Sequence, residues 1–179
     1  MIRRNRYYLL GLYMAGFFIG ILYANFIGVN YITSTGIFHE YFLSQYINQE
    51  ILTEKYFFYL VKQRVGPVLL LAFAGMTIFR KIAAVFCLLW TGFAGGTLAV
   101  AAVVRMGFAG MLFYFAAILP HSIFYALAYV ILICYLSEMP ANKWNLWKTA
   151  FVILSIIAGI LTEAYINPYI VKWAIKIMG

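Results

Sequence analysis

The sequence predicts an all-α, polytopic integral membrane protein with about five transmembrane helices, and two observations lead to this prediction. Hydrophobic residues make up 66% of the 179 residues and charged residues only 10%, whereas about a quarter of the residues in a soluble domain are charged. Long apolar runs also alternate with short polar or basic stretches, which is the pattern of successive membrane spans. We therefore expect a single membrane domain over residues 1–179.

The net charge of +8 comes from 13 Lys and Arg against five glutamates. Basic residues that flank membrane spans hold the orientation of the protein and contact anionic lipid. No Lys/Arg cluster typical of nucleic-acid binding is present, so we expect the lipid bilayer and no nucleic acid as a partner. Cys87 and Cys134 both lie in apolar runs without a CxxC pair, so neither a disulfide nor a metal site is expected. No cofactor is predicted.

The first predicted span covers residues 7–29 and follows the basic residues Arg3, Arg4 and Arg6. It is too long for a cleaved signal and lacks a small-x-small cleavage site, so we interpret it as a retained anchor. Small residues recur along it at intervals of four and form one smooth stripe, which lets a second helix approach closely. The stripe consists of Gly16, Gly20, Ala24 and Gly28.

Residues 30–64 differ in character, because they hold three of the five glutamates and many aromatic residues among polar ones. Apolar residues repeat there at intervals of three and four, which predicts an extracytoplasmic amphipathic helical segment lying along the membrane interface. A docking surface for another protein is compatible with this interpretation.

Four further spans are predicted after this segment. The apolar run at 68–79 is short for a span, so we expect it to recruit residues on its N-terminal side. Gly92 and Gly96 form a second face for close packing in the third span. The predicted spans cover residues 65–79, 82–104, 107–136 and 149–171.

The distribution of basic residues predicts a cytoplasmic N-terminus. Five spans in this orientation place seven Lys and Arg on the cytoplasmic side and six on the outer side. The densest cluster lies next to the first span, where the positive-inside rule has most weight. The 30–64 segment then faces outward.

Two ionisable residues, His121 and Glu163, stand inside predicted spans, where an acid costs roughly 2.5–3.5 kcal/mol on insertion scales. Pro120 next to His121 should kink the fourth span. Ser122, Asn167 and Pro168 are expected to support the joint between the last two spans. A hydrogen bond between His121 and Glu163 would relieve the burial cost of both groups.

Three interpretations of the pair follow: a structural clasp between spans, a path for protons or ions, and an intramembrane catalytic site. No aspartate pair, HExxH or Gly-x-Ser-x-Gly pattern accompanies the two residues. We therefore expect no catalytic residues and a protein that is not an enzyme.

The stretch Leu119-Pro120-His121-Ser122-Ile123-Phe124 resembles the Pro-His-Gly-Ile core of the stage II sporulation protein M family. Gly159-x-x-x-Glu163 followed by Asn167-Pro168 resembles the last span of that family. Members are five-span proteins of similar size with a long segment after the first span, so the resemblance covers most of the chain. Ser122 stands where the family commonly has Gly, and Tyr125 stands where it has Glu.

The resemblance implies a non-enzymatic scaffold in the bacterial cytoplasmic membrane. It implies partners among cell-wall hydrolases, as in the engulfment complex of sporulation or a related role in the cell envelope. A homo-oligomer is also possible. The alternative function is a small transporter or permease component with an ion or proton site at His121 and Glu163.

Overall fold

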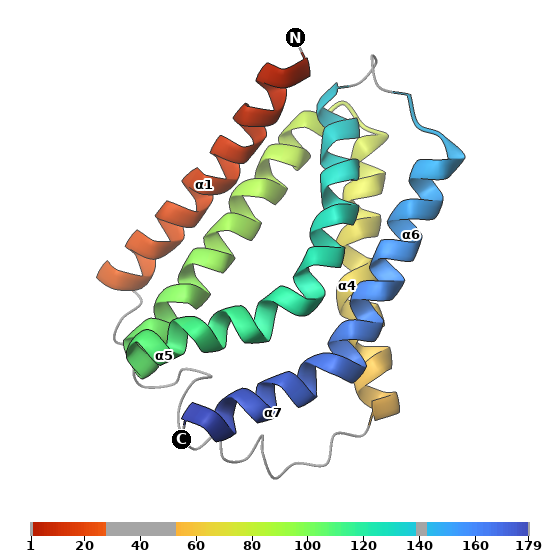
Figure 1. Ribbon diagram of the computed structural model, residues 1–179. Helices are drawn as coiled ribbons and strands as arrows, with labels where there is room; N and C mark the ends of the chain where they lie inside the picture. The colour runs from red at the N-terminus through yellow and green to blue at the C-terminus, as the bar shows by residue number, and fades with distance from the viewer. Residues whose placement is uncertain (1, 28–52, 139–142, 179) are drawn as a thin grey trace. The chain divides into compact units, whose positions relative to one another are not determined.

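The computed structural model describes residues 2–27, 53–138 and 143–178, and these residues are helical apart from short turns. The predicted all-α fold class is confirmed over this part of the chain, which contains no strand (Figure 1). The helices are α1 (Ile2–Phe26), α4 (Thr53–Gly75), α5 (Arg80–Glu138), α6 (Leu146–Leu161), the π-helix η1 (Thr162–Ile166) and α7 (Asn167–Met178).

Five stretches of these helices are long and apolar enough to cross a membrane, as the sequence predicted. Three of them correspond closely to a predicted span, and the last is longer than predicted. They are Tyr7–Phe26, Glu54–Gly75, Arg80–Val104, Met106–Glu138 and Leu146–Ile177.

The second helix begins earlier than the predicted boundary at residue 65. Helix α4 starts at Thr53, so Lys62 and Arg64 lie inside it rather than in an outward loop. The short apolar run does gain length on its N-terminal side, and α4 ends at Gly75 instead of residue 79. Residues 53–64 of the predicted amphipathic segment belong to this helix, and its residues 30–52 lie outside the described part of the chain.

Helix α5 contains two of the candidate spans, which meet at Gly107 without a connecting loop. Gly107 has φ 60° and ψ −138°, a backbone conformation that is essentially restricted to glycine. A break was expected here, between the spans predicted at 82–104 and 107–136, but without a role for this glycine. Pro120, which was expected to kink the fourth span, lies within the second half of α5, and the assigned helix continues past it to Glu138.

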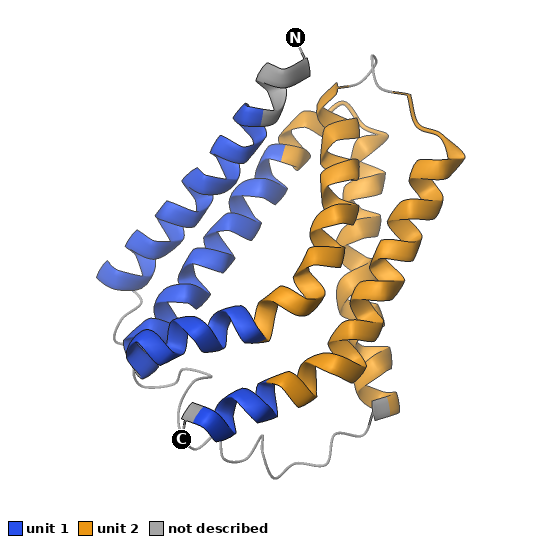
Figure 2. Cartoon of the chain, viewed as in Figure 1, with its two compact units in different colours: residues 1–49, 85–116, 171–179 blue, residues 50–84, 117–170 orange. Residues whose placement is uncertain are grey.

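The chain forms two compact units, each assembled from separate stretches of sequence (Figure 2). The first contains residues 1–49, 85–116 and 171–179, and the second contains residues 50–84 and 117–170. The prediction of one membrane domain stays a prediction.

In the first unit, α1 and the first half of α5 approach each other through small residues. A Cβ added to Gly16 or Gly20 would overlap the backbone of Leu89 or Phe93. Gly92 and Gly96 are equally close to the backbone of α1, at Tyr13 and Phe17. The two faces of small residues therefore pack on each other, while Gly28 lies outside the described residues.

In the second unit, α4 packs against α6 and η1. The second half of α5 joins this core: a Cβ on Gly75 would lie 2.5 Å from Leu136 Cδ2, and one on Gly159 would lie 2.6 Å from the ring of Tyr125. Asn145 caps α6, because its side chain accepts a hydrogen bond of 3.0 Å from the Lys148 N–H. These contacts bring α4, α5 and the α6–η1 segment around one buried region.

Candidate functional site

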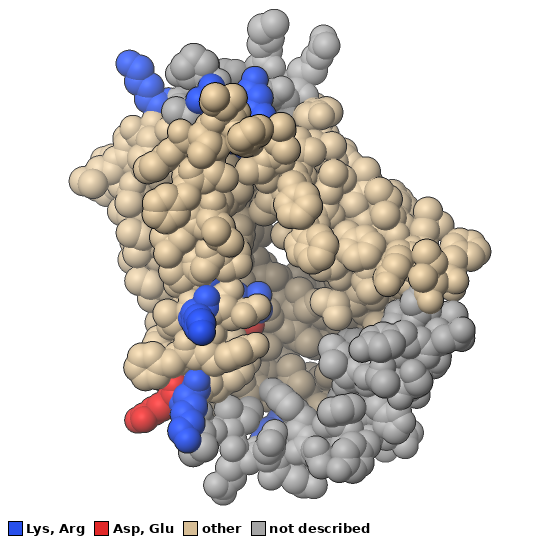
Figure 3. Space-filling view, turned by 180° about the vertical axis from the view of Figure 1, so that it is seen from behind, with Lys and Arg blue, Asp and Glu red and all other residues tan. Residues whose placement is uncertain are grey.

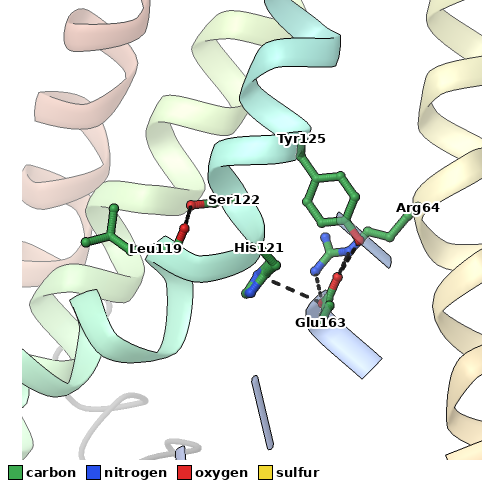
Figure 4. A network of polar contacts seen from close by, with 6 residues as sticks. All are labelled: Arg64, Leu119, His121, Ser122, Tyr125 and Glu163. Atoms are coloured by element: carbon green, nitrogen blue, oxygen red, sulfur yellow. Dashed lines mark hydrogen bonds and ion pairs between the residues drawn. The ribbon is translucent and has the colours of Figure 1, made fainter. Parts of the chain in front are cut away.

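Polar side chains from three segments of the second unit meet at Glu163 (Figure 4). Arg64 comes from α4, His121 and Tyr125 come from α5, and Glu163 comes from η1. His121 and Tyr125 are four residues apart, which places them on one face of the helix. We call these four residues the polar cluster.

Both carboxylate oxygens of Glu163 accept hydrogen bonds. Arg64 donates from Nε to Oε2 at 2.9 Å and from Nη2 to Oε1. The hydroxyl of Tyr125 donates to Oε2 at 2.7 Å. A bidentate guanidinium–carboxylate pair is among the stronger hydrogen-bonded arrangements in proteins. The negative charge of Glu163 is thus neutralised inside the cluster.

The two charged partners differ in exposure. The Glu163 side chain is 7% exposed, whereas the Arg64 side chain is 38% exposed. The guanidinium carbon of Arg64 also lies 5.1 Å from the centre of the Tyr125 ring, within the range of a cation–π interaction. Tyr125 therefore contacts both charges, and the missing side chain of Gly159 leaves space for its ring.

His121 is close to Glu163 but forms no hydrogen bond with it. Its Nε2 lies 4.0 Å from Glu163 Oε1, which is too long for a hydrogen bond. The imidazole makes an edge contact with the Tyr125 ring, with 5.9 Å between ring centres. The expected pair is brought together, but the direct partners of Glu163 are Arg64 and Tyr125.

Two buried polar atoms beside the cluster lack a hydrogen-bond partner: His121 Nδ1 and Asn167 Oδ1. The Asn167 side chain approaches the imidazole without completing a hydrogen bond. Most buried polar atoms in proteins are paired, so each such exception calls for a physical explanation.

Glu163 stands on a π-helix rather than on a regular α-helix. The N–H of Asn167 donates to the carbonyl of Thr162, five residues earlier. The Thr162 hydroxyl donates to the carbonyl of Ala158 at 2.7 Å. A single π-turn inside an α-helix is uncommon and is often found at functional sites.

The four residues lie near the middle of their candidate spans. Arg64 is close to the midpoint of Glu54–Gly75, and Glu163 is close to that of Leu146–Ile177. His121 and Tyr125 are central in Met106–Glu138. At a rise of 1.5 Å per residue, Arg64 is about 15 Å from either end of its candidate span.

The remaining predicted residues have smaller roles. Ser122 stays on its own helix, where its hydroxyl donates to the Leu119 carbonyl at 3.4 Å (Figure 4). Pro168 is buried directly after Asn167. Arg64 and Tyr125 were missed. The sequence did contain a signal for Arg64. The apolar run at 68–79 is too short for a span, and extending it on its N-terminal side places Arg64 inside the span.

The arrangement can join three helices through one carboxylate, and it can bring a proton-binding imidazole near that carboxylate. Within the ranges that the structure describes, no three His, Cys, Asp or Glu residues come together to hold a metal ion. No family model, curated protein or solved structure matches the chain.

Proposed function

We propose that this chain is a multi-pass protein of the bacterial cytoplasmic membrane. Five helices of sufficient length and apolarity support the proposal. Large apolar side chains are exposed along them, including Phe26 at 80% and Leu70 at 72%. Uncharged side chains cover most of the described surface in Figure 3. Exposed apolar surface on this scale suits a lipid environment.

The proposed orientation has the N-terminus in the cytoplasm. Lys62 and Arg64 lie well inside α4, whereas Lys55 lies at its outer end and still counts as a flanking residue. Leaving Lys62 and Arg64 out of the outer count gives seven basic residues on the cytoplasmic side against four outside, compared with seven against six before. The positive-inside rule therefore favours this orientation more strongly once α4 starts at Thr53.

Within that membrane, the proposed role is that of a non-enzymatic scaffold whose helices are joined by the polar cluster. The observation that carries this proposal is the complete engagement of Glu163 by Arg64 and Tyr125. A carboxylate neutralised by a fixed internal cation contributes to the joint between helices, and it is not free to exchange ions.

The proposed partners are cell-wall hydrolases outside the membrane, as the resemblance to the stage II sporulation protein M family implies. The outward segment up to residue 52 would supply the docking surface. Co-purification tests this role: reversing the charges of Glu40 and Glu50 should abolish recovery of envelope partners while the chain stays abundant. Unchanged recovery would place the docking surface elsewhere.

A second candidate, a small transporter or permease component, is favoured by one specific observation. His121 Nδ1 and Asn167 Oδ1 are buried without partners beside a π-helix near the middle of the candidate spans. Irregular helix and polar groups at that depth are typical of transport sites.

The two candidates predict different results for Glu163→Gln and His121→Ala. A transporter loses proton-coupled flux in reconstituted vesicles while abundance and folding stay normal. A scaffold loses stability or partner recovery, and wild-type vesicles show no flux above that of empty ones. Measuring flux, abundance and co-purification on the same preparations separates the two functions.

A further inference from the structure

The imidazole of His121 has one buried nitrogen without a hydrogen-bond partner, and its other nitrogen faces a carboxylate. A neutral imidazole carries one N–H donor and one acceptor nitrogen. Nε2 faces the carboxylate oxygen Oε1 of Glu163 at 4.0 Å. Nδ1 is buried without a partner, and Asn167 Oδ1, an acceptor near the ring, is also unpaired.

The two neutral tautomers leave different groups without a partner. With the proton on Nε2, Nδ1 and Asn167 Oδ1 are two buried acceptors. With the proton on Nδ1, that N–H can donate to Asn167 Oδ1, but the lone pair of Nε2 then faces the carboxylate. An imidazolium has a donor on each nitrogen, so one form of the ring could serve both oxygens.

We propose that His121 is an intramembrane proton-binding site, in which the imidazolium donates from Nδ1 to Asn167 Oδ1 and from Nε2 to Glu163 Oε1. The ligand is a proton supplied by hydronium from the aqueous phase: an N–H bond forms at the ring nitrogen that holds the free lone pair, an O–H bond of hydronium breaks, and water is left. The inference rests on the proposal that these helices cross a membrane, but it requires neither partner recruitment nor flux.

The charged and titratable neighbours define how the added charge is balanced. Arg64 of α4 and Glu163 of η1 neutralise each other, Tyr125 of α5 donates to Glu163, and Asn167 of α7 adds no charge. Tyr129 of α5 also lies near Arg64.

Proton binding therefore makes the cluster a site where two cations share one carboxylate. Arg64 Nη2 and His121 Nε2 both face Oε1. Oε1 has two lone pairs, so it can accept from Arg64 Nη2 and from His121 Nε2 together while Arg64 Nε stays bonded to Oε2. The π-helix places Glu163 where both cations reach it.

Nitrogen NMR of the full-length chain in lipid bilayers tests the proposal. The chain contains two histidines, so His39→Gln leaves His121 as the source of the imidazole signals. The expected spectrum shows one protonated and one unprotonated ring nitrogen at pH 8, and two protonated nitrogens at pH 5. A spectrum that still shows a neutral His121 imidazole at pH 5 would overturn the proposal, whatever the co-purification and flux experiments show.

Two further variants test the proposed acceptors. Each acceptor contributes a hydrogen bond to the charged ring, so Asn167→Leu or Glu163→Gln should lower the ratio of protonated to neutral imidazole by about ten- to a hundredfold at the wild-type midpoint. Ser122→Ala is the matched control on the same helix and should leave the midpoint unchanged. If His121 in Asn167→Leu is protonated at the same pH midpoint as in the wild type, the proposed hydrogen bond from Nδ1 to Asn167 Oδ1 is wrong.

Discussion

Replacing Glu163 with glutamine should destabilise the helix bundle more than any other conservative change in the polar cluster. The substitution preserves the shape of the side chain and one oxygen that can accept from Tyr125. It removes the charge that pairs with Arg64. Arg64 then keeps a positive charge inside a helix bundle without its anion.

The magnitude follows from burial. Removing one partner of a fully buried ion pair costs about 3–5 kcal/mol. The Arg64 side chain is 38% exposed, so part of its charge is already solvated and the cost falls below that of a fully buried pair. We expect Glu163→Gln to lower the free energy of unfolding by about 2–3 kcal/mol.

A double-mutant cycle in mixed micelles measures this effect. Arg64→Gln with Glu163→Gln removes both charges, so the double variant should be more stable than Glu163→Gln alone, with a coupling energy of about 1–3 kcal/mol. Lys62→Gln is the matched control: it is an exposed residue of the same helix and should stay within about 0.5 kcal/mol of wild type. Additive effects of the two cluster substitutions would refute the reasoning.

Three further predictions concern packing, backbone and orientation. Gly16→Ala and Gly92→Ala should each lower the free energy of unfolding by about 1–3 kcal/mol in the same assay, because the new methyl group meets the backbone of the facing helix. Gly11→Ala is the control, since Gly11 has open space around it, and it should be neutral or stabilising. Equal effects of the three substitutions would contradict the close packing of the two helices. Gly107→Ala should cost about 1–3 kcal/mol because of its positive φ, and a neutral result would contradict that backbone conformation. In a chain carrying Cys87→Ala and Cys134→Ala, an impermeant thiol reagent applied outside should label Glu54→Cys and not Asn145→Cys; the reverse pattern would invert the proposed orientation.

Composition and apolar patterning sufficed to predict the helices, because a chain with 10% charged residues has few alternatives to membrane spans. Small residues spaced by four on α1 and α5 likewise indicated close packing before the contacts were known. The start of α4 was less predictable. Lys62 and Arg64 resemble the flank of a span, and the tertiary partner that neutralises Arg64 is 99 residues away in the sequence.

Only part of the polar cluster could be predicted, again because its contacts join residues that are far apart in the sequence. His121 and Glu163 are conspicuous in apolar runs, so the sequence identified them. Tyr125 is an ordinary residue in an aromatic-rich chain, and its bond to Glu163 becomes visible only when α5 packs against η1. The π-helix has no recognisable local signal in Thr162–Ile166.

The pairing of Arg64 with Glu163 inside the membrane is the central claim, and solid-state NMR in lipid bilayers tests it most directly. Dipolar dephasing between guanidinium nitrogens and glutamate carboxyl carbons reports an arginine–glutamate pair. The pair predicts dephasing in the wild-type chain that decreases in both Arg64→Gln and Glu163→Gln. Wild-type spectra without dephasing, or dephasing that is unchanged in both variants, would contradict the pair.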